Sequence, residues 1–167
     1  AVETLEYGDE ILTSDGRVTP VNWLGKQSVD VRMSDPAKVN PICITAGALG
    51  NGLPQRDLRL SPDHAIEIDG YLINAGALVN GTSIYQDPRM QAADFTYYHV
   101  ETGAHEFLLA EGVAAETFAD FTNISKYDNA DEMRTKAIAE MDMPRITTAR
   151  LVPDHIRTRL MPLLVAE

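Results

Sequence analysis

The most informative part of the sequence is the run Asp57-Leu58-Arg59-Leu60-Ser61-Pro62-Asp63-His64-Ala65-Ile66-Glu67-Ile68-Asp69-Gly70. Apolar and polar residues alternate on both sides of Ser61 to His64, which is typical of β-strands with one buried face. Pro62 has no N–H group to donate to a strand ladder, so residues 61–64 should form a turn or bulge between two strands. Such a turn would place the Ser61 hydroxyl and the His64 imidazole at the same rim of a sheet.

A serine and a histidine three positions apart also occur often by chance. The simplest alternative is a turn in which the Ser61 side chain bonds local backbone, with a half-buried His64 beside it. The residues on both sides of the turn therefore have to distinguish a catalytic motif from an ordinary turn.

Those flanking residues resemble the Hint family, which comprises hedgehog autoprocessing domains, inteins and bacterial intein-like domains. The family motif is Thr-x-x-His after a strand, followed by a stretch of small residues that ends in Leu and Gly. Here Ser61-Pro62-Asp63-His64 keeps the hydroxyl and the imidazole, and residues 74–81 read Asn-Ala-Gly-Ala-Leu-Val-Asn-Gly. The resemblance is closest to secreted bacterial members and extends from about Val2 to about Phe121. It implies an all-β, horseshoe-like fold of short strands with pseudo-two-fold symmetry.

An internal similarity is compatible with two related halves. Residues 44–52 read Ile-Thr-Ala-Gly-Ala-Leu-Gly-Asn-Gly, and residues 73–81 read Ile-Asn-Ala-Gly-Ala-Leu-Val-Asn-Gly. Similarity at a fixed spacing can mark a duplicated structural unit. One short copy can also be coincidence.

The C-terminal part of the chain has a different character. We expect a Hint domain over residues 1–121, followed by a linker and a helical C-terminal extension over residues 122–167. Residues 131–141 carry apolar positions on roughly one helical face, and Asn129 is a suitable N-cap with Glu132 three residues later. A second short helix is expected over residues 153–160, with Pro153 in its first turn.

Composition excludes several classes of protein. A formal charge of −11 argues against nucleic acid as a partner, because its phosphates would be repelled. No apolar run reaches membrane-spanning length, and the residues from Ala1 onward do not resemble a signal peptide. The single cysteine, Cys43, allows no internal disulfide and is expected to be a small buried thiol. The location is open, although the resemblance is compatible with a secreted bacterial protein.

The resemblance implies autocatalytic cleavage through an N–S acyl shift at a cysteine. In Hint domains that cysteine begins a strand which would lie before Ala1, so we expect the present chain alone to be inert. The segment fused upstream would be the substrate, and a thiol, an amine or water would accept the acyl group. By resemblance, His64 engages the scissile amide and Ser61 is its hydroxyl partner.

Two further histidines are candidate site residues. His99 stands where many Hint domains have an aspartate that tunes the cysteine thiol, and an imidazole there could act as a base. His105 matches the histidine of the closing hairpin. The alternative for both is that they fill strand edges, which we favour for His105.

The end of the motif region departs from inteins, which finish in His-Asn. Here the corresponding residues are Ala115-Glu116-Thr117, so succinimide formation by an asparagine is not available and complete splicing is not expected.

Two other classes of function stay open. His64, His99 and His105, with Asp63 or Glu101, could converge on zinc, although their spacing fits no zinc signature and no cofactor is expected. A β-module that only binds a partner is the other alternative.

Overall fold

Short β-strands make up most of the regular structure in residues 1–88, 94–119, 123–134 and 137–161, the part of the chain described by the computed structural model. The strands are β1 (Glu10–Leu12), β2 (Val18–Pro20), β3 (Trp23–Val29), β4 (Ile42–Ile44), β5 (Leu58–Leu60), β6 (Ala65–Ile68), β7 (Tyr71–Asn74), β8 (Ile84–Gln86), β9 (Phe95–Glu101), β10 (Phe107–Ala110), β11 (Val113–Glu116) and β12 (Arg145–Ile146). The helices are α1 (Pro36–Val39) and α2 (Asp154–Leu160), with 3₁₀ turns η1 (Val2–Thr4), η2 (Ala75–Leu78), η4 (Ile124–Lys126), η5 (Ala130–Glu132) and η6 (Ala149–Leu151). The predicted all-β architecture with a small helical C-terminal piece is confirmed.

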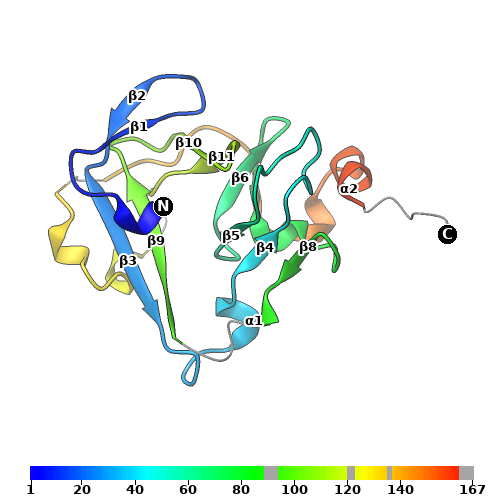
Figure 1. Cartoon of the computed structure of the whole chain (residues 1–167), viewed down its shortest axis with the longest axis horizontal. Helices are drawn as coiled ribbons and strands as arrows, with labels where there is room; N and C mark the ends of the chain where they lie inside the picture. Colours follow the sequence, from blue (N-terminus) through cyan, green and yellow to red (C-terminus); the bar gives the residue numbers. More distant parts are fainter. Residues whose placement is uncertain (89–93, 120–122, 135–136, 162–167) are drawn as a thin grey trace.

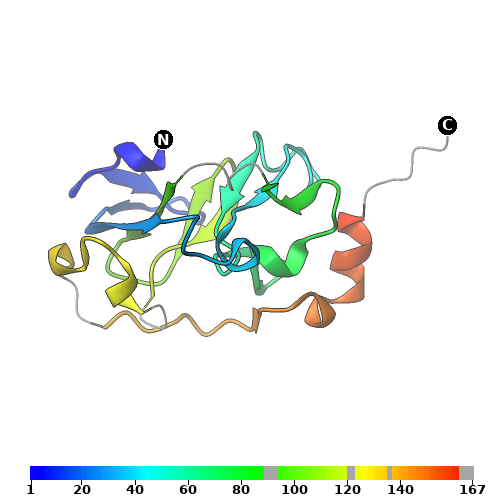
Figure 2. The same cartoon turned by 90° about the horizontal axis from the view of Figure 1, so that it is seen from below.

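The strands form small sheets that together make a flattened molecule (Figures 1 and 2). The two long strands β3 and β9 form an antiparallel ribbon, and β1 pairs with β2. The other two sheets are the three-stranded β5-β4-β8 and the five-stranded β10-β11-β6-β7-β12. The strand β12 joins that larger sheet in parallel to β7, although it is far away in sequence.

The alternating run identified in the sequence forms β5 and β6, as predicted. Leu58 and Leu60 are buried while Arg59 between them is exposed, which reproduces the period of two. Asp69 and Gly70 make the next turn with φ of 52° and 81°, in the left-handed region that short polar residues and glycine tolerate best. The local pattern therefore determines both strands and both turns.

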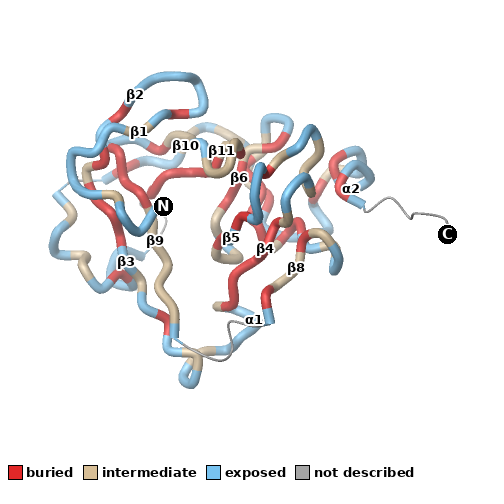
Figure 3. The backbone as a smooth tube through the Cα atoms, viewed as in Figure 1, coloured by how far each residue is buried: buried red, intermediate tan, exposed pale blue. Residues whose placement is uncertain are grey.

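The largest hydrophobic core among the described residues is built from β4 to β8, β11 and the C-terminal segment with β12 and α2 (Figure 3). Its fully buried members include Ile44, Ile66, Ile73, Ile84 and Ile156. A second core contains Trp23, Phe118, Ala119, Tyr127 and Ile138. Both cores include residues from the C-terminal part of the chain.

The predicted helix over residues 131–141 is wrong. Only the 3₁₀ turn η5 forms there, and the described residues 133–134 and 137–144 are not helical, while 135–136 lie outside the described residues. Ile138 packs in the core with Trp23, and the backbone N–H of Met141 donates to a ring nitrogen of His105. These contacts with the β-structure replace the i→i−4 bonds of a helix, so tertiary packing outweighs local propensity.

The segment after residue 123 runs along one side of the molecule (Figure 2). It leads through β12 to α2, the short helix that was predicted and is confirmed. The expected boundary between residues 121 and 122 lies outside the described residues. No helix in the described part of the chain is long and apolar enough to cross a membrane.

Candidate active site

The turn of residues 61–64 is held from two sides. Its own backbone closes it, since the N–H of His64 donates to the Ser61 carbonyl at 3.1 Å. The first residues of η2 also bind the turn. The N–H of Ala75 donates to the His64 carbonyl and the N–H of Gly76 donates to the Pro62 carbonyl, both at 2.9 Å. A Cβ at Gly76 would lie 3.1 Å from the Pro62 carbonyl oxygen, so the small residues after β7 permit this close approach.

The rings of His64 and His99 are neighbours, although they come from different parts of the fold. His64 comes from the β5–β6 turn, and His99 comes from β9, where it lies opposite Gly25 of β3. The two imidazole rings are 4.7 Å apart between centroids and are inclined by 37°. Both residues are half-buried overall, but the Nε2 atom of each is shielded from solvent and has no hydrogen-bond partner among the described residues. Unpaired buried nitrogens are costly, which is a reason to expect a ligand or reacting group beside them.

Burial keeps both imidazoles neutral. It lowers the pKa of His64, while the nearby Glu116 charge and a hydrogen bond to the Glu116 backbone oppose that shift. Burial, together with the neighbouring His64, lowers the pKa of His99 to about 3. A neutral imidazole can both accept and donate a proton, as general acid–base chemistry requires.

Both rings line a groove of about 1160 Å³. Its walls come mainly from residues 56–61 around β5, residues 95–100 of β9 and residues 108–111 at the end of β10. Ser61 and Ala1 also line it, so the first residue of the chain lies at the same groove as His64 and His99. No hydrogen bond joins the Ser61 hydroxyl to the His64 ring within the described structure.

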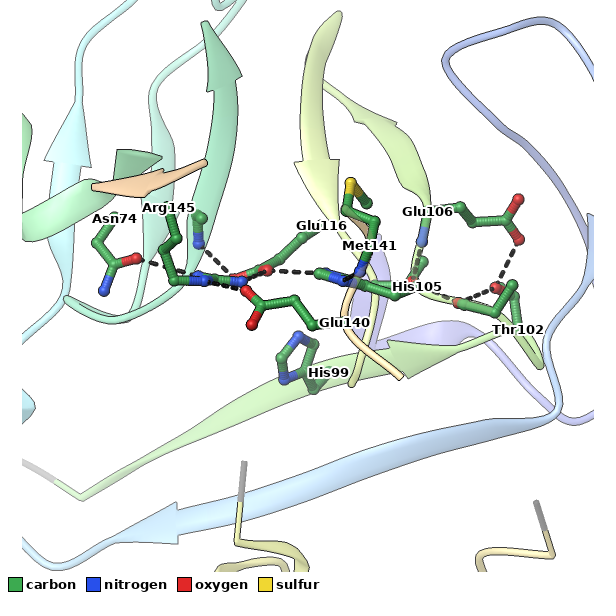
Figure 4. Close-up of polar contacts among 12 residues, drawn as sticks. Asn74, His99, Thr102, His105, Glu106, Glu116, Glu140, Met141 and Arg145 are labelled. Carbon is green, nitrogen blue, oxygen red and sulfur yellow. Dashed lines mark hydrogen bonds and ion pairs between the residues drawn. The ribbon is translucent and has the colours of Figure 1, made fainter. Parts of the chain in front are cut away.

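A buried carboxylate, Glu116, lies near His99 (Figure 4) and lines the same groove as His64 and His99. Its Oε1 accepts from the Ala65 N–H at 2.7 Å, and its Oε2 is 2.9 Å from His105 Nε2. Arg145 donates to both carboxylate oxygens, and it also contacts Asn74 and Glu140. Burial alone would raise the pKa of Glu116, but the hydrogen bonds from His105 and Arg145 lower it to about 2. Glu116 is therefore a fixed negative charge.

A family model of the Hint domain matches residues 1–122. The chain belongs to the Hint domain family. No curated protein and no solved structure gives a significant match to it.

The structure places Ser61 and His64 in one turn and brings the ring of His99 next to that of His64. His105 is elsewhere in the site. Its Nδ1 accepts from the Met141 N–H at 3.0 Å, so its Nε2 must carry the proton donated to Glu116. With both nitrogens engaged and no surface on the groove, His105 orients Glu116 in this Hint domain.

Three residues of this Hint domain site were not predicted from the sequence. Glu116 was recognised only as a departure from the intein ending, and Tyr127 and Arg145 lie in the segment expected to be a linker and extension. The Tyr127 hydroxyl is 2.9 Å from His99 Nδ1, and Arg145 pairs with Glu116. The sequence carries no local signal for these contacts, because their partners are distant along the chain.

The alternative of a zinc site does not fit this Hint domain. His105 has both ring nitrogens engaged, and Asp63 is exposed. Glu101 accepts from the Gly103 N–H in a turn of its own. Among the described residues, no group of three or more His, Cys, Asp or Glu side chains is arranged to hold a metal ion.

Proposed function

We propose that this Hint domain cleaves the peptide bond before a cysteine located upstream of Ala1, through an N–S acyl shift. The observation that carries the proposal is the pair of buried, unpartnered Nε2 atoms of His64 and His99 at the groove where Ala1 lies. Membership of an autoprocessing family supports the same general activity.

The groove is suited to an extended peptide that leads into Ala1. The strand β5 is at the edge of its sheet, and β9 pairs only with β3 in the described sheets. Edge strands offer backbone donors and acceptors to an added strand. The apolar side chains of Leu58, Phe95 and Leu108 line the same space and would contact alternate side chains of that strand.

In the proposed step the cysteine sulfur attacks the carbonyl carbon of the preceding residue. A carbon–sulfur bond forms, the carbon–nitrogen bond breaks, and the thiol proton ends on the departing amine. With the proton of its neutral ring on Nδ1, His64 can accept the thiol proton at Nε2, which has no hydrogen-bond partner among the described residues. The same Nε2 then delivers that proton to the amide nitrogen.

The resulting thioester would be resolved by an external thiol, an amine or water. By resemblance, Ala115-Glu116-Thr117 correspond to the end of an intein, which finishes in His-Asn, so no succinimide step is proposed. The buried anion instead raises the proton affinity of His64, against the effect of burial.

The test is a fusion in which a reporter and a cysteine-initiated upstream segment precede Ala1. Cleavage at the reporter–cysteine bond is expected, with acceleration by added thiol. His64→Ala should reduce the rate by about 10²–10⁴-fold, the usual cost of losing a positioned acid–base group. Ser61→Ala should cost less, because its hydroxyl makes no hydrogen bond to His64 in the described structure.

Two matched controls define the site. His155→Ala removes an exposed imidazole on α2, and Cys43→Ser alters the buried thiol of β4; neither should change the cleavage rate. If the His64→Ala fusion cleaves as fast as its parent, the imidazole has been assigned wrongly. A folded fusion that never cleaves would contradict the proposal and would support the alternative of a β-module that only binds a partner.

A further inference from the structure

Tyr127 reaches the site from beyond the residues matched by the Hint family model. Its side chain is buried, and its hydroxyl lies 2.9 Å from Nδ1 of His99. The family match ends at residue 122, so this contact belongs to a part of the chain outside the matched domain.

The position of Tyr127 is fixed by its neighbours along β3. The indole N–H of Trp23 donates to the Asn129 carbonyl at 3.1 Å, and the Asp128 N–H donates to the Lys26 carbonyl at 2.7 Å. The Tyr127 ring packs edge-on against Trp23, with centroids 5.1 Å apart. A Cβ at Gly25 would be 2.8 Å from the Tyr127 ring, so the absence of a side chain there makes room for the tyrosine.

The direction of the hydrogen bond between Tyr127 and His99 follows from which of the two groups carries a proton. Burial and the Glu116 charge raise the pKa of Tyr127, so the phenol keeps its proton. Among the described residues, the hydroxyl is paired with Nδ1 of His99. The His99 ring is neutral because burial lowers its pKa to about 3. If Nδ1 carried the proton, the phenol oxygen would accept it, and the phenol O–H would have no acceptor among the described residues. The arrangement that gives the phenol O–H an acceptor has the phenol donating to Nδ1 of His99.

We infer that Tyr127 is a positioning residue that fixes His99 in the tautomer with its proton on Nε2. The groove then contains a donor, the Nε2–H of His99, beside an acceptor, the Nε2 of His64. Such a pair suits a reaction that needs a base for the thiol and a donor for the developing oxyanion. The role of the His99 Nε2–H toward the oxyanion rests on the proposed function, whereas the assignment of the His99 tautomer does not. In this tautomer His99 offers a donor at Nε2, whereas the sequence indicated that an imidazole at this position could act as a base.

The tautomer is measured by long-range ¹H–¹⁵N NMR of the imidazole rings in the 167-residue chain, which contains four histidines. Wild-type His99 should show an unprotonated Nδ1 and a protonated Nε2. Tyr127→Phe should remove this preference, so that both tautomers or the opposite one appear. Tyr71→Phe, a half-buried tyrosine on β7, is the matched control and should leave the His99 signals unchanged.

A protonated Nδ1 in wild-type His99 would overturn the inference even if Tyr127→Phe failed to fold. An unchanged tautomer in a folded Tyr127→Phe variant would overturn it as well. In the reporter fusion, Tyr127→Phe should slow cleavage roughly 10-fold, less than the 10²–10³-fold lost when an oxyanion donor is deleted. If the wild-type fusion does not cleave, the proposed function fails while the NMR result still decides the role of Tyr127.

Discussion

The substitution Arg145→Met tests whether the buried carboxylate depends on the C-terminal segment. Methionine keeps much of the apolar stem of arginine and removes its charge and its hydrogen bonds. The side chain of Glu116 is 1% exposed and that of Arg145 is 15% exposed, so the variant leaves a buried anion without its arginine partner. Breaking a buried ion pair in this way costs about 3–5 kcal/mol. Since Glu116 keeps its bonds to Ala65 and His105, we expect a loss of about 3 kcal/mol.

The pH dependence of stability gives a second value for the free energy that the partners of Glu116 contribute. The pKa of Glu116 is lowered from 4.5 to about 2 by its partners. A difference of about 2.5 in pKa corresponds to about 3 kcal/mol of stability above pH 4.5. This contribution is lost as the pH falls from 4.5 toward 2, because the unfolded chain then binds a proton that the folded chain does not. In Arg145→Met the pKa of Glu116 rises, so the dependence on pH in this window should become shallower.

The assay is urea unfolding at pH 7 and at several values between pH 2 and 5, with a thermal melt at pH 7. A loss of about 3 kcal/mol should lower the Tm by about 6–12 °C in a domain of this size. Arg56→Met is the matched control, because Arg56 also pairs with a glutamate, Glu111, but its side chain is 81% exposed. An exposed pair contributes less than about 1 kcal/mol. Equal losses in the two variants would refute the structural importance of the Arg145–Glu116 pair.

Two further substitutions probe the packing and the protonation of the imidazoles. Gly25→Ala puts a methyl group within 2.5 Å of the Trp23 ring and 2.8 Å of Tyr127, so we expect a loss of about 1–3 kcal/mol in urea unfolding and a disturbed His99 tautomer. The pKa values of His64 and His99 are lowered on folding, so stability should fall as the pH drops below about 6.5, where the unfolded imidazoles bind protons first. His99→Gln should reduce this decline between pH 7 and pH 5, and an undiminished decline would place its origin elsewhere.

The parts of the fold that follow from local sequence were predictable. The strands β5 and β6 and the turn between them arise from a period of two and from Pro62, and the structure contains all three. The association of Ser61 with His64 followed from the same local argument. The approach of His99 was implied by family resemblance alone, because β9 reaches the turn only through tertiary packing.

The features that the sequence did not predict correctly depend on contacts between residues that are distant along the chain. Residues 131–141 have a helical pattern, but Ile138 is used in the core around Trp23 and the chain continues to β12. Glu116 is separated by 29 residues from Arg145 and by 11 from His105, so no local motif marks the carboxylate as a buried charge. An isolated sequence position cannot show whether a glutamate has partners that offset its burial.

The physical unit of the site therefore extends beyond the residues that resemble other Hint domains. Without the chain after residue 122, Nδ1 of His99 would lose the Tyr127 hydroxyl, and Glu116 would lose Arg145. The indole N–H of Trp23 would also lose its carbonyl acceptor on Asn129. Each loss removes a hydrogen bond from a group within or beside the groove. Buried polar groups without partners destabilise a preorganised site. The matched region supplies the two imidazoles, and the segment after it supplies the Tyr127 hydroxyl, whose hydrogen bond fixes the tautomer of His99.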